Sequence, residues 1–192
     1  MATRLRPGSS FLYDSDTGDI VGVKDIDGSE LFFMRIPHTG SWLDLSDQTA
    51  SADTATAMEF DTVVTESGIT VVDLSKVTFS RKARYNLQFS AQLVNTGNDE
   101  STVSIWLKKN NGNVADSNTD ITVPKKHAGG DGKLVAAWNF FLDLEAGDYV
   151  ELMWSSTSAD TSIQYIAARN TPTRPATPSI ILTVNEVDGS YP

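Results

Sequence analysis

An all-β fold is indicated most strongly by residues 133–154, which read KLVAAWNFFLDLEAGDYVELMW. Apolar side chains recur at every second position on both sides of the turn sequence EAGD, at residues 145–148, and this alternation is the pattern of β-strands. The pattern predicts a β-hairpin at the centre of a β-sandwich. One face of the hairpin carries Leu134, Ala136, Trp138, Phe140, Leu142, Val150, Leu152 and Trp154.

The other face of the predicted hairpin is also too apolar for a sheet that has one side in water. It carries Val135, Ala137, Phe141, Tyr149 and Met153. We therefore expect this face to contact another chain. A second apolar face favours an assembling structural protein over an enzyme.

Length and composition set the broad class of the protein. The 192 residues, 40% of them hydrophobic, are enough for one medium domain with a small appendage. Cysteine is absent, so neither disulfides nor thiolate zinc sites contribute. Residues 1–8 lack the apolar run of a secretory signal, and no segment approaches the roughly 20 apolar residues that span a bilayer. We expect folding in the cytoplasm and no membrane partner.

The net charge of the chain argues against one class of partner. There are 15 Lys and Arg residues against 25 Asp and Glu residues, which gives a formal charge of −10. Most of such a surface repels a phosphate backbone, and the few basic clusters are short and lie next to turn residues. Nucleic acid is therefore not an expected ligand.

The N-terminal part of the chain is predicted to form a small β meander. Three short strand-like runs, at residues 11–13, 20–23 and 30–34, are joined by Asp- and Gly-containing turns. A meander of this size is not stable alone, so it must pack on the main domain or on a partner. We divide the chain into an attachment segment, residues 1–47, and a main domain, residues 48–192. The expected anchor residues are Phe11, Tyr13, Phe32, Phe33 and Met34.

Several strands of the main domain can be read from their alternation. Residues 84–93 carry large apolar side chains on one face and Asn86, Gln88, Ser90 and Gln92 on the other, so one face is core and the other is polar but uncharged. Residues 102–109 alternate in the same way, and the NNGN sequence at residues 110–113 predicts a hairpin turn. Residues 179–187 are apolar on both faces, which predicts a central strand.

No catalytic or metal site is predicted. His38 and His127 lie in loop-like sequence without a recognisable serine or carboxylate partner for a hydrolytic triad. Two acidic turns, which begin at Asp14 and Asp25, have oxygen ligands at alternate positions as calcium sites do, but neither fits the twelve-residue calcium loop. Aspartate favours such turns for local reasons as well. No pair of carboxylates stands out for glycoside cleavage, and we expect no cofactor.

The tryptophans give one candidate contact surface. Trp106, Trp138 and Trp154 are suited in principle to stacking on sugars. Trp138 and Trp154 share the register of the apolar faces of their strands, which favours a place in the core. Trp106 falls on the opposite face of its strand, which favours a subunit or partner contact.

The chain also resembles known families. About ten short strands in this order resemble the globular head shared by complement-type and tumour-necrosis-factor-type proteins, which are jelly rolls that trimerise. The sequence is more similar to tail-fibre and other virion structural proteins of tailed bacteriophages, especially marine and cyanobacterial ones, and this likeness spans roughly residues 48–187. It rests on the following segments: QFSAQL at residues 88–93, SIWLKK at 104–109, DSN at 116–118, VAAWNFFL at 135–142, DYVELMW at 148–154 and PSIILTV at 178–184. Residues 13–23 and 27–30 are similar to segments at the start of phage appendage proteins.

The resemblance implies a homotrimer in which the strands at Arg84, Leu134 and Ser179 face the threefold axis. Together with the patterns above, it gives an all-β jelly-roll sandwich of tumour-necrosis-factor type with an N-terminal β meander. The expected function is that of a non-enzymatic virion protein, a capsid decoration or short head fibre docked on the major capsid protein or another virion protein. The expected trimer-interface residues are Tyr149, Met153, Trp106, Phe141 and Ile181.

Two alternatives to this function remain open. The same trimer is suited to a tail fibre, as a receptor-binding knob that recognises a host cell-surface glycan through exposed loops such as residues 110–113 or 127–132. A carbohydrate-active enzyme is the alternative from a different class. It requires a cleft with two close carboxylates.

Overall fold

The computed structural model describes residues 8, 10–13, 20–24, 26–28, 30–33 and 36–188. In this part of the chain every regular element is a β-strand, which confirms the predicted all-β class. The chain divides into two compact units, Met1–Pro37 and His38–Pro192. This boundary lies earlier than the one we placed at residue 47, because β4 (Thr39–Asp44) pairs along its length with two strands of the larger unit.

The N-terminal unit is the predicted meander. It consists of β1 (Ser10–Tyr13), β2 (Ile20–Lys24) and β3 (Glu30–Phe33), which pair antiparallel in the order β1-β2-β3. Gly28, with φ of 87°, lies between β2 and β3, where a left-handed backbone suits glycine. Each strand of the unit thus pairs with the next strand in sequence, as short connecting turns require.

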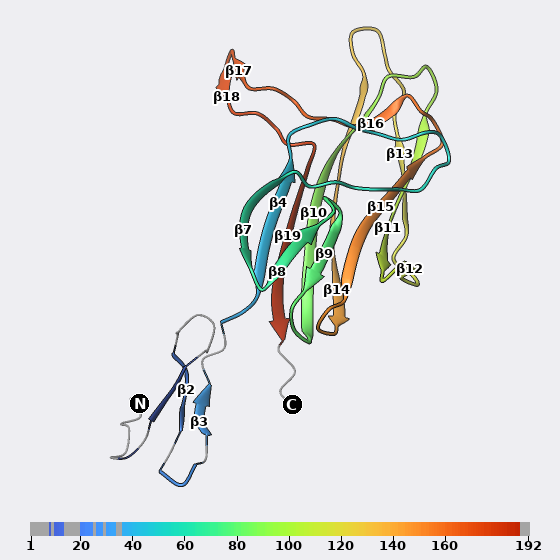
Figure 1. Cartoon of the computed structure of the whole chain (residues 1–192). Coiled ribbons are helices and arrows are strands. Elements are labelled where there is room, and N and C mark those ends of the chain that lie inside the picture. Colours follow the sequence, from blue (N-terminus) through green and yellow to red (C-terminus); the bar gives the residue numbers. More distant parts are fainter. Residues whose placement is uncertain are drawn as a thin grey trace. The chain divides into compact units, whose positions relative to one another are not determined.

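The larger unit is a sandwich of two mixed-length antiparallel sheets (Figure 1). Sheet I has the order β5-β16-β10-β19-β4-β7, and β14 pairs with the other edge of β10. Its strands besides β4 are β5 (Gln48–Thr49), β7 (Thr62–Ser67), β10 (Ala83–Asn95), β14 (Gly132–Leu144), β16 (Thr161–Ile163) and β19 (Ile180–Asp188). The last strand, β19, lies between β10 and β4, so its predicted central place is confirmed.

Sheet II has the order β12-β11-β15-β9-β8, with β13 paired to β11 and β6 paired to β15. Its strands are β6 (Thr56–Ala57), β8 (Ile69–Val72), β9 (Lys76–Phe79), β11 (Ser101–Lys109), β12 (Gly112–Asn113), β13 (Thr119–Val123) and β15 (Tyr149–Ser156). Asn110 and Asn111, between β11 and β12, have φ of 47° and 71°. Positive φ at two consecutive central residues is the geometry of a two-residue type I′ hairpin, as the NNGN sequence predicts.

The predicted hairpin of residues 133–154 is wrong. Its two strands exist as β14 and β15, but β14 pairs with β10 in sheet I, whereas β15 pairs with β11 and β9 in sheet II. The turn at Gly147, with φ of 86°, carries the chain from one sheet to the other. Alternation of side chains shows which face of a strand is buried but not which strand is its neighbour, and a tight turn is compatible with both arrangements.

The core lies between the two sheets and is built from the inward faces that alternation predicts. In β10, Tyr85, Leu87 and Phe89 are buried, and Phe79 of sheet II packs on Tyr85 with ring centroids 4.5 Å apart. The largest fully buried side chains come from both sheets: Trp42, Trp154, Tyr85, Phe79, Met58, Ile69, Leu93, Ile105, Leu107, Leu144, Ile163 and Ile180. Burial of these side chains is the main favourable contribution to folding.

A pair of leucines tests this assignment of the core. Leu107 is 1% exposed in β11, and Leu45 is 45% exposed just after β4. Leu107→Ala should lower the free energy of unfolding by about 2–5 kcal/mol, because it leaves a cavity between the sheets. Leu45→Ala should lower it by less than about 1 kcal/mol. Urea unfolding followed by tryptophan fluorescence measures both, and equal losses would contradict the proposed position of the core.

Candidate functional site

The outer face of sheet I is the surface of the sandwich that differs most from its surroundings. Strand pairing places three cross-strand rows on this face, which we take as its definition: Ala137–Ser90–Ile181–Leu43, Asn139–Gln88–Thr183–Ser41 and Phe141–Asn86–Asn185–Thr39. None of these residues is ionisable, although the chain has 25 acidic and 15 basic residues. A patch across four strands without a charge is unusual for the free surface of so charged a chain.

Large apolar side chains are exposed on and around this face. Phe141 is 59% exposed and Ile181 is 38% exposed, and the adjoining positions Val135 and Val187 are 56% and 50% exposed. All four lie on β14 or β19, the strands that flank β10. Val135 and Val187 form an apolar margin of the face, whereas Phe141 and Ile181 lie within its rows. Exposed apolar side chains together with a lack of charge are typical of the centre of protein interfaces.

The polar groups of this face interact within the subunit but retain free donors and acceptors. Asn139 Nδ2 donates to Asn86 Oδ1 at 3.0 Å. Beyond the three rows, Arg84 donates to Asp143 through Nε at 2.7 Å and through Nη2 at 2.9 Å, and this hydrogen bonding lowers the pKa of Asp143 below its usual value. Side-chain amides both donate and accept, so they can pair with the same groups of an identical chain.

A shallow depression lies on the same face. Its lining is formed by Gln88, Phe89, Ser90, Ala137, Trp138, Asn139, Ile181 and Thr183. The small side chains of Ser90 and Ala137 lie opposite each other in the pairing of β10 and β14, between longer neighbours. A hollow of this kind can accept a projecting side chain from a second molecule.

The outer face of sheet II has the more ordinary composition of a protein surface. Lys108 and Glu151 are cross-strand partners there, and Lys76 lies 5.7 Å from the centroid of the Tyr149 ring. Asp120, on the neighbouring strand β13, accepts a hydrogen bond from Ser104 at 2.7 Å. Charged groups are thus spread across this face, in contrast to the outer face of sheet I.

The five residues predicted for the trimer interface do not form one surface. Phe141 and Ile181 lie on the outer face of sheet I, whereas Tyr149, Met153 and Trp106 lie on β15 and β11 of sheet II. Met153 is only 7% exposed and pairs with Trp106. The separation follows from the crossing between sheets after β14, which places the two halves of the supposed hairpin in different sheets.

The tryptophans occupy the places that their registers predict. Trp154 is fully buried in the core. Trp138, on β14, is partly buried and packs against the core cluster, and the centroid of its ring lies 4.6 Å from that of Phe89 in an edge-on arrangement. Trp106 is half-buried on the outer face of sheet II, where its Nε1 donates to Asn113 Oδ1 at 3.0 Å. The three indoles therefore do not form a common platform for sugar stacking.

Of the predicted anchor residues, Phe11 and Tyr13 lie on β1 and are 46% and 61% exposed. Phe32 and Phe33 belong to β3, and Met34 lies outside the described residues. Two exposed aromatic rings on a three-stranded meander are consistent with a docking surface, and their role as an anchor stays a prediction.

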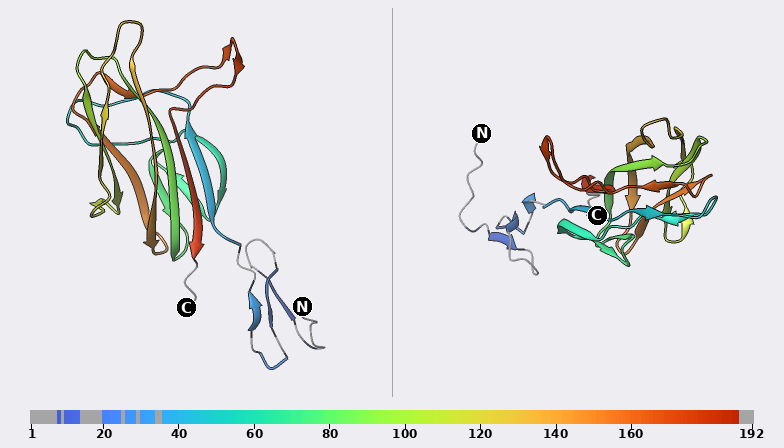
Figure 2. Two further views of the ribbon diagram at one scale, coloured as in Figure 1. Left: turned by 180° about the vertical axis from the view of Figure 1, so that it is seen from behind. Right: turned by 90° about the horizontal axis from the view of Figure 1, so that it is seen from above.

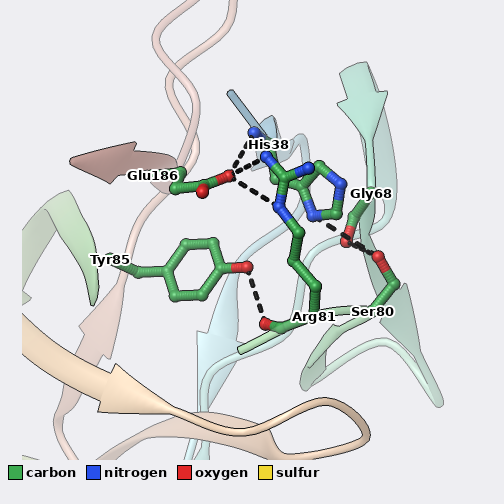
Figure 3. Close-up of polar contacts among 6 residues, drawn as sticks. All are labelled: His38, Gly68, Ser80, Arg81, Tyr85 and Glu186. Atoms are coloured by element: carbon green, nitrogen blue, oxygen red, sulfur yellow. Dashed lines mark hydrogen bonds and ion pairs between the residues drawn. The ribbon is translucent and has the colours of Figure 1, made fainter. Parts of the chain in front are cut away.

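A polar cluster joins both ends of the sandwich chain at the base of sheet I (Figure 3). The backbone N–H of His38 donates to Glu186 Oε2 at 2.8 Å. Arg81 donates to the same oxygen through Nε at 3.0 Å and through Nη2. The Glu186 side chain is 4% exposed, so this charge lies almost out of water and is stabilised by Arg81.

The same cluster contains a Ser–His contact that must be compared with a hydrolytic triad. Ser80 Oγ lies 3.4 Å from His38 Nδ1, but this hydroxyl also donates to the carbonyl oxygen of Gly68 at 2.8 Å. Glu186 binds the main chain of His38, whereas a triad carboxylate orients the imidazole itself. The contacts fit a structural clamp that fixes the start of β4 against the end of β19. Sequence reasoning missed this clamp, because its charged partners lie 105 residues apart.

No group of three or more acidic or histidine side chains is placed to hold a metal ion within the part of the chain that the structure describes. The acidic turn that begins at Asp14 lies outside this part, as does Asp25 of the second turn, so calcium binding at these turns stays a question for the sequence alone. Among the same described residues, no helix is long and apolar enough to cross a membrane.

Comparison with known proteins identifies the fold. No protein-family model and no curated protein matches the sequence. Among solved structures, the chain is similar to murine APRIL, a protein of the tumour-necrosis-factor family, with a TM-score of 0.51 and 9% identity. The match covers 79% of this chain and 100% of the other. At so low an identity the likeness concerns the fold alone, and the chain has the jelly-roll sandwich fold of tumour-necrosis-factor type.

The clamp can be tested with two arginines that differ in the burial of their partners. Arg81→Met should lower the free energy of unfolding by about 3 kcal/mol, because the buried Glu186 loses its ion-pair partner. Arg84→Met removes the exposed pair with Asp143 and should leave stability nearly unchanged. Adding Glu186→Gln to Arg81→Met should recover part of the loss. Similar losses in the two single variants, measured by thermal unfolding, would argue against a clamp.

Proposed function

We propose that this chain is a non-enzymatic structural protein of a tailed-phage particle that forms a homotrimer through the outer face of sheet I. The observation that carries the proposal is the uncharged, apolar-edged patch on that face. In an acidic protein, side chains that remain in water have no reason to avoid charge over four strands. A face that is buried against identical copies should lack charge, because unpaired charges there are costly to desolvate.

Two further features support self-association through sheet I. The strand β14 is 13 residues long and pairs only with β10 among the described strands, so its other edge carries backbone groups that a partner can cover. Homo-oligomers with closed symmetry are the commonest soluble assemblies. The threefold symmetry itself is inferred from the jelly-roll fold and from the resemblance to trimeric heads.

The place in a phage particle is inferred from the sequence resemblance of residues 48–187. We favour a capsid decoration or a short head fibre as its role. The N-terminal unit then serves as the attachment device, with Phe11 and Tyr13 as exposed contacts. Three copies of a weak anchor bind far more firmly than one when all three engage the same particle.

The alternative is a knob on the tail that recognises the host surface. It is favoured by the loops at residues 110–113 and 127–132, which are exposed except at Gly132 and include the tip of the β11–β12 hairpin. In this alternative the same trimer is present in few copies and binds a cell-surface glycan.

The oligomeric state tests the role of sheet I directly. Wild-type protein at micromolar concentration should have three times the 20.8-kDa subunit mass in sizing with light scattering. Ile181→Asp should give a monomer, because it places a carboxylate in the uncharged interface. Val72→Asp is the matched control, since Val72 is 47% exposed on β8 of sheet II and should leave the trimer intact. A monomeric wild type, or dissociation by both variants alike, would refute the proposal.

The particle location is tested in virions. The protein should be found in purified particles, and hundreds of copies by quantitative mass spectrometry indicate a capsid decoration, whereas a handful indicates a tail knob. Deletion of residues 1–37 should abolish incorporation while the remaining unit still trimerises, because this segment is a separate compact unit. Particles that lack the wild-type protein altogether would contradict a virion role.

A further inference from the structure

A short β-hairpin projects from the sandwich in the segment of chain that connects β16 to β19 of sheet I (Figures 1 and 2). It consists of β17 (Arg169–Asn170) and β18 (Thr173–Arg174), and its stem is the bridge between Ile166 and Thr177, with backbone hydrogen bonds of 2.9 and 2.8 Å. All residues from 167 to 175 are exposed, so the tip packs on no described part of its own subunit. We call residues 166–177 the arm.

The arm has an unfavourable arrangement of charge. Arg169 and Arg174 are directly opposite each other in the pairing of β17 and β18, so both guanidinium groups leave the same face of the ribbon. Like charges in this position repel each other. Residues 161–185 contain no Asp or Glu, and no carboxylate among the described residues forms an ion pair with either arginine. An isolated two-stranded hairpin is only marginally stable in water. Because residues 167–175 are exposed, the subunit itself supplies few contacts that would offset the repulsion.

The root of the arm adjoins the surface through which we propose that the protein assembles. Ile166 shares a second depression with Gln92, Leu93, Val94, Lys133, Leu134 and Val135. Val135 belongs to the apolar margin of the outer face of sheet I, and Gln92 continues the polar side of β10. The arm therefore begins where a neighbouring subunit is expected and extends away from the body of its own subunit.

We propose that the arm grips a second copy of this chain, with Arg169 and Arg174 binding carboxylates on that copy. This inference rests on the proposed homo-oligomer. Planar guanidinium groups are suited to carboxylates, which they bind through two parallel hydrogen bonds. Each copy contributes 25 acidic residues and a net charge of −10, so a neighbouring subunit offers the complementary charge at high effective concentration. A free polyanion is the less suitable ligand, because the rest of the acidic surface repels it.

A zero-length cross-link reports the contact directly. The variant R169K/R174K keeps both positive charges and provides amines that a carbodiimide joins to carboxylates in contact. Trimers are assembled from equal amounts of isotopically heavy and light subunits, cross-linked and digested. We expect heavy–light peptide pairs that join position 169 or 174 to an Asp or Glu. Lys126, which is exposed in another loop, gives the background of accidental links. Pairs of one isotope only, or none above that background, would overturn the proposal.

Subunit exchange gives an independent readout. R169A/R174A should exchange subunits about tenfold faster than wild type, and the wild-type rate should rise with salt, because an ion-pair contact is lost in both cases. T171A/T173A alters the same exposed tip without changing its charge and should exchange at the wild-type rate. Equal exchange in all three proteins would refute the arm while leaving the homotrimer in place. A monomeric wild type would refute the homotrimer and the arm together.

Discussion

The structure depends on one constraint, which is that two sheets must bury one face each in a single core. The alternation of apolar and polar residues satisfies this constraint in β10 and β11, where every inward side chain from Tyr85 to Leu93 and from Val103 to Leu107 is buried. Once the inward faces are fixed, the outward faces are fixed as well, because a strand cannot shift by one residue without exposing its whole apolar set. The core requires apolar residues only at the inward positions of each strand. The lack of charge at the outward positions of sheet I is therefore not a consequence of core formation.

The clamp at Glu186 solves a second problem, which is how the chain enters and leaves the sandwich. Thr39 at the start of β4 pairs with Asn185 near the end of β19, so the first and last strands of the larger unit lie side by side. A carboxylate there receives the His38 N–H and the Arg81 guanidinium, and Tyr85 donates to the Arg81 carbonyl oxygen at 3.0 Å. This arrangement links the clamp to the core through Tyr85, which is buried. Local fraying at the point where the N-terminal unit joins is thereby opposed.

The sequence allows the faces of strands to be predicted better than their neighbours. The burial of Leu87, the central place of β19 and the turn at Asn110 follow from alternation, two-sided apolarity and turn chemistry, which are local properties. The pairing of β14 with β10 and the pairing of Arg81 with Glu186 are long-range, and no local pattern specifies them. The error over the hairpin at residues 133–154 therefore also misplaced Tyr149 and Met153, because the assignment of a shared face depended on the assumed pairing. The prolines at residues 172 and 175 indicate only that the arm does not join a sheet interior, and no local pattern specifies its projection.

For the proposed homotrimer, the charge distribution gives a reason why subunits would associate through one face without aggregating. Subunits with a net charge of −10 repel each other in most orientations, so random contacts between their charged faces are short-lived. The outer face of sheet I is exempt from this repulsion, because its three rows carry no charge, and it exposes Phe141 and Ile181. A threefold ring of identical copies closes when the rotation between neighbouring subunits does, and a closed ring leaves no free interface for further growth. If the arm binds as proposed, the acidic surface that opposes random contacts also supplies the carboxylates for the arm.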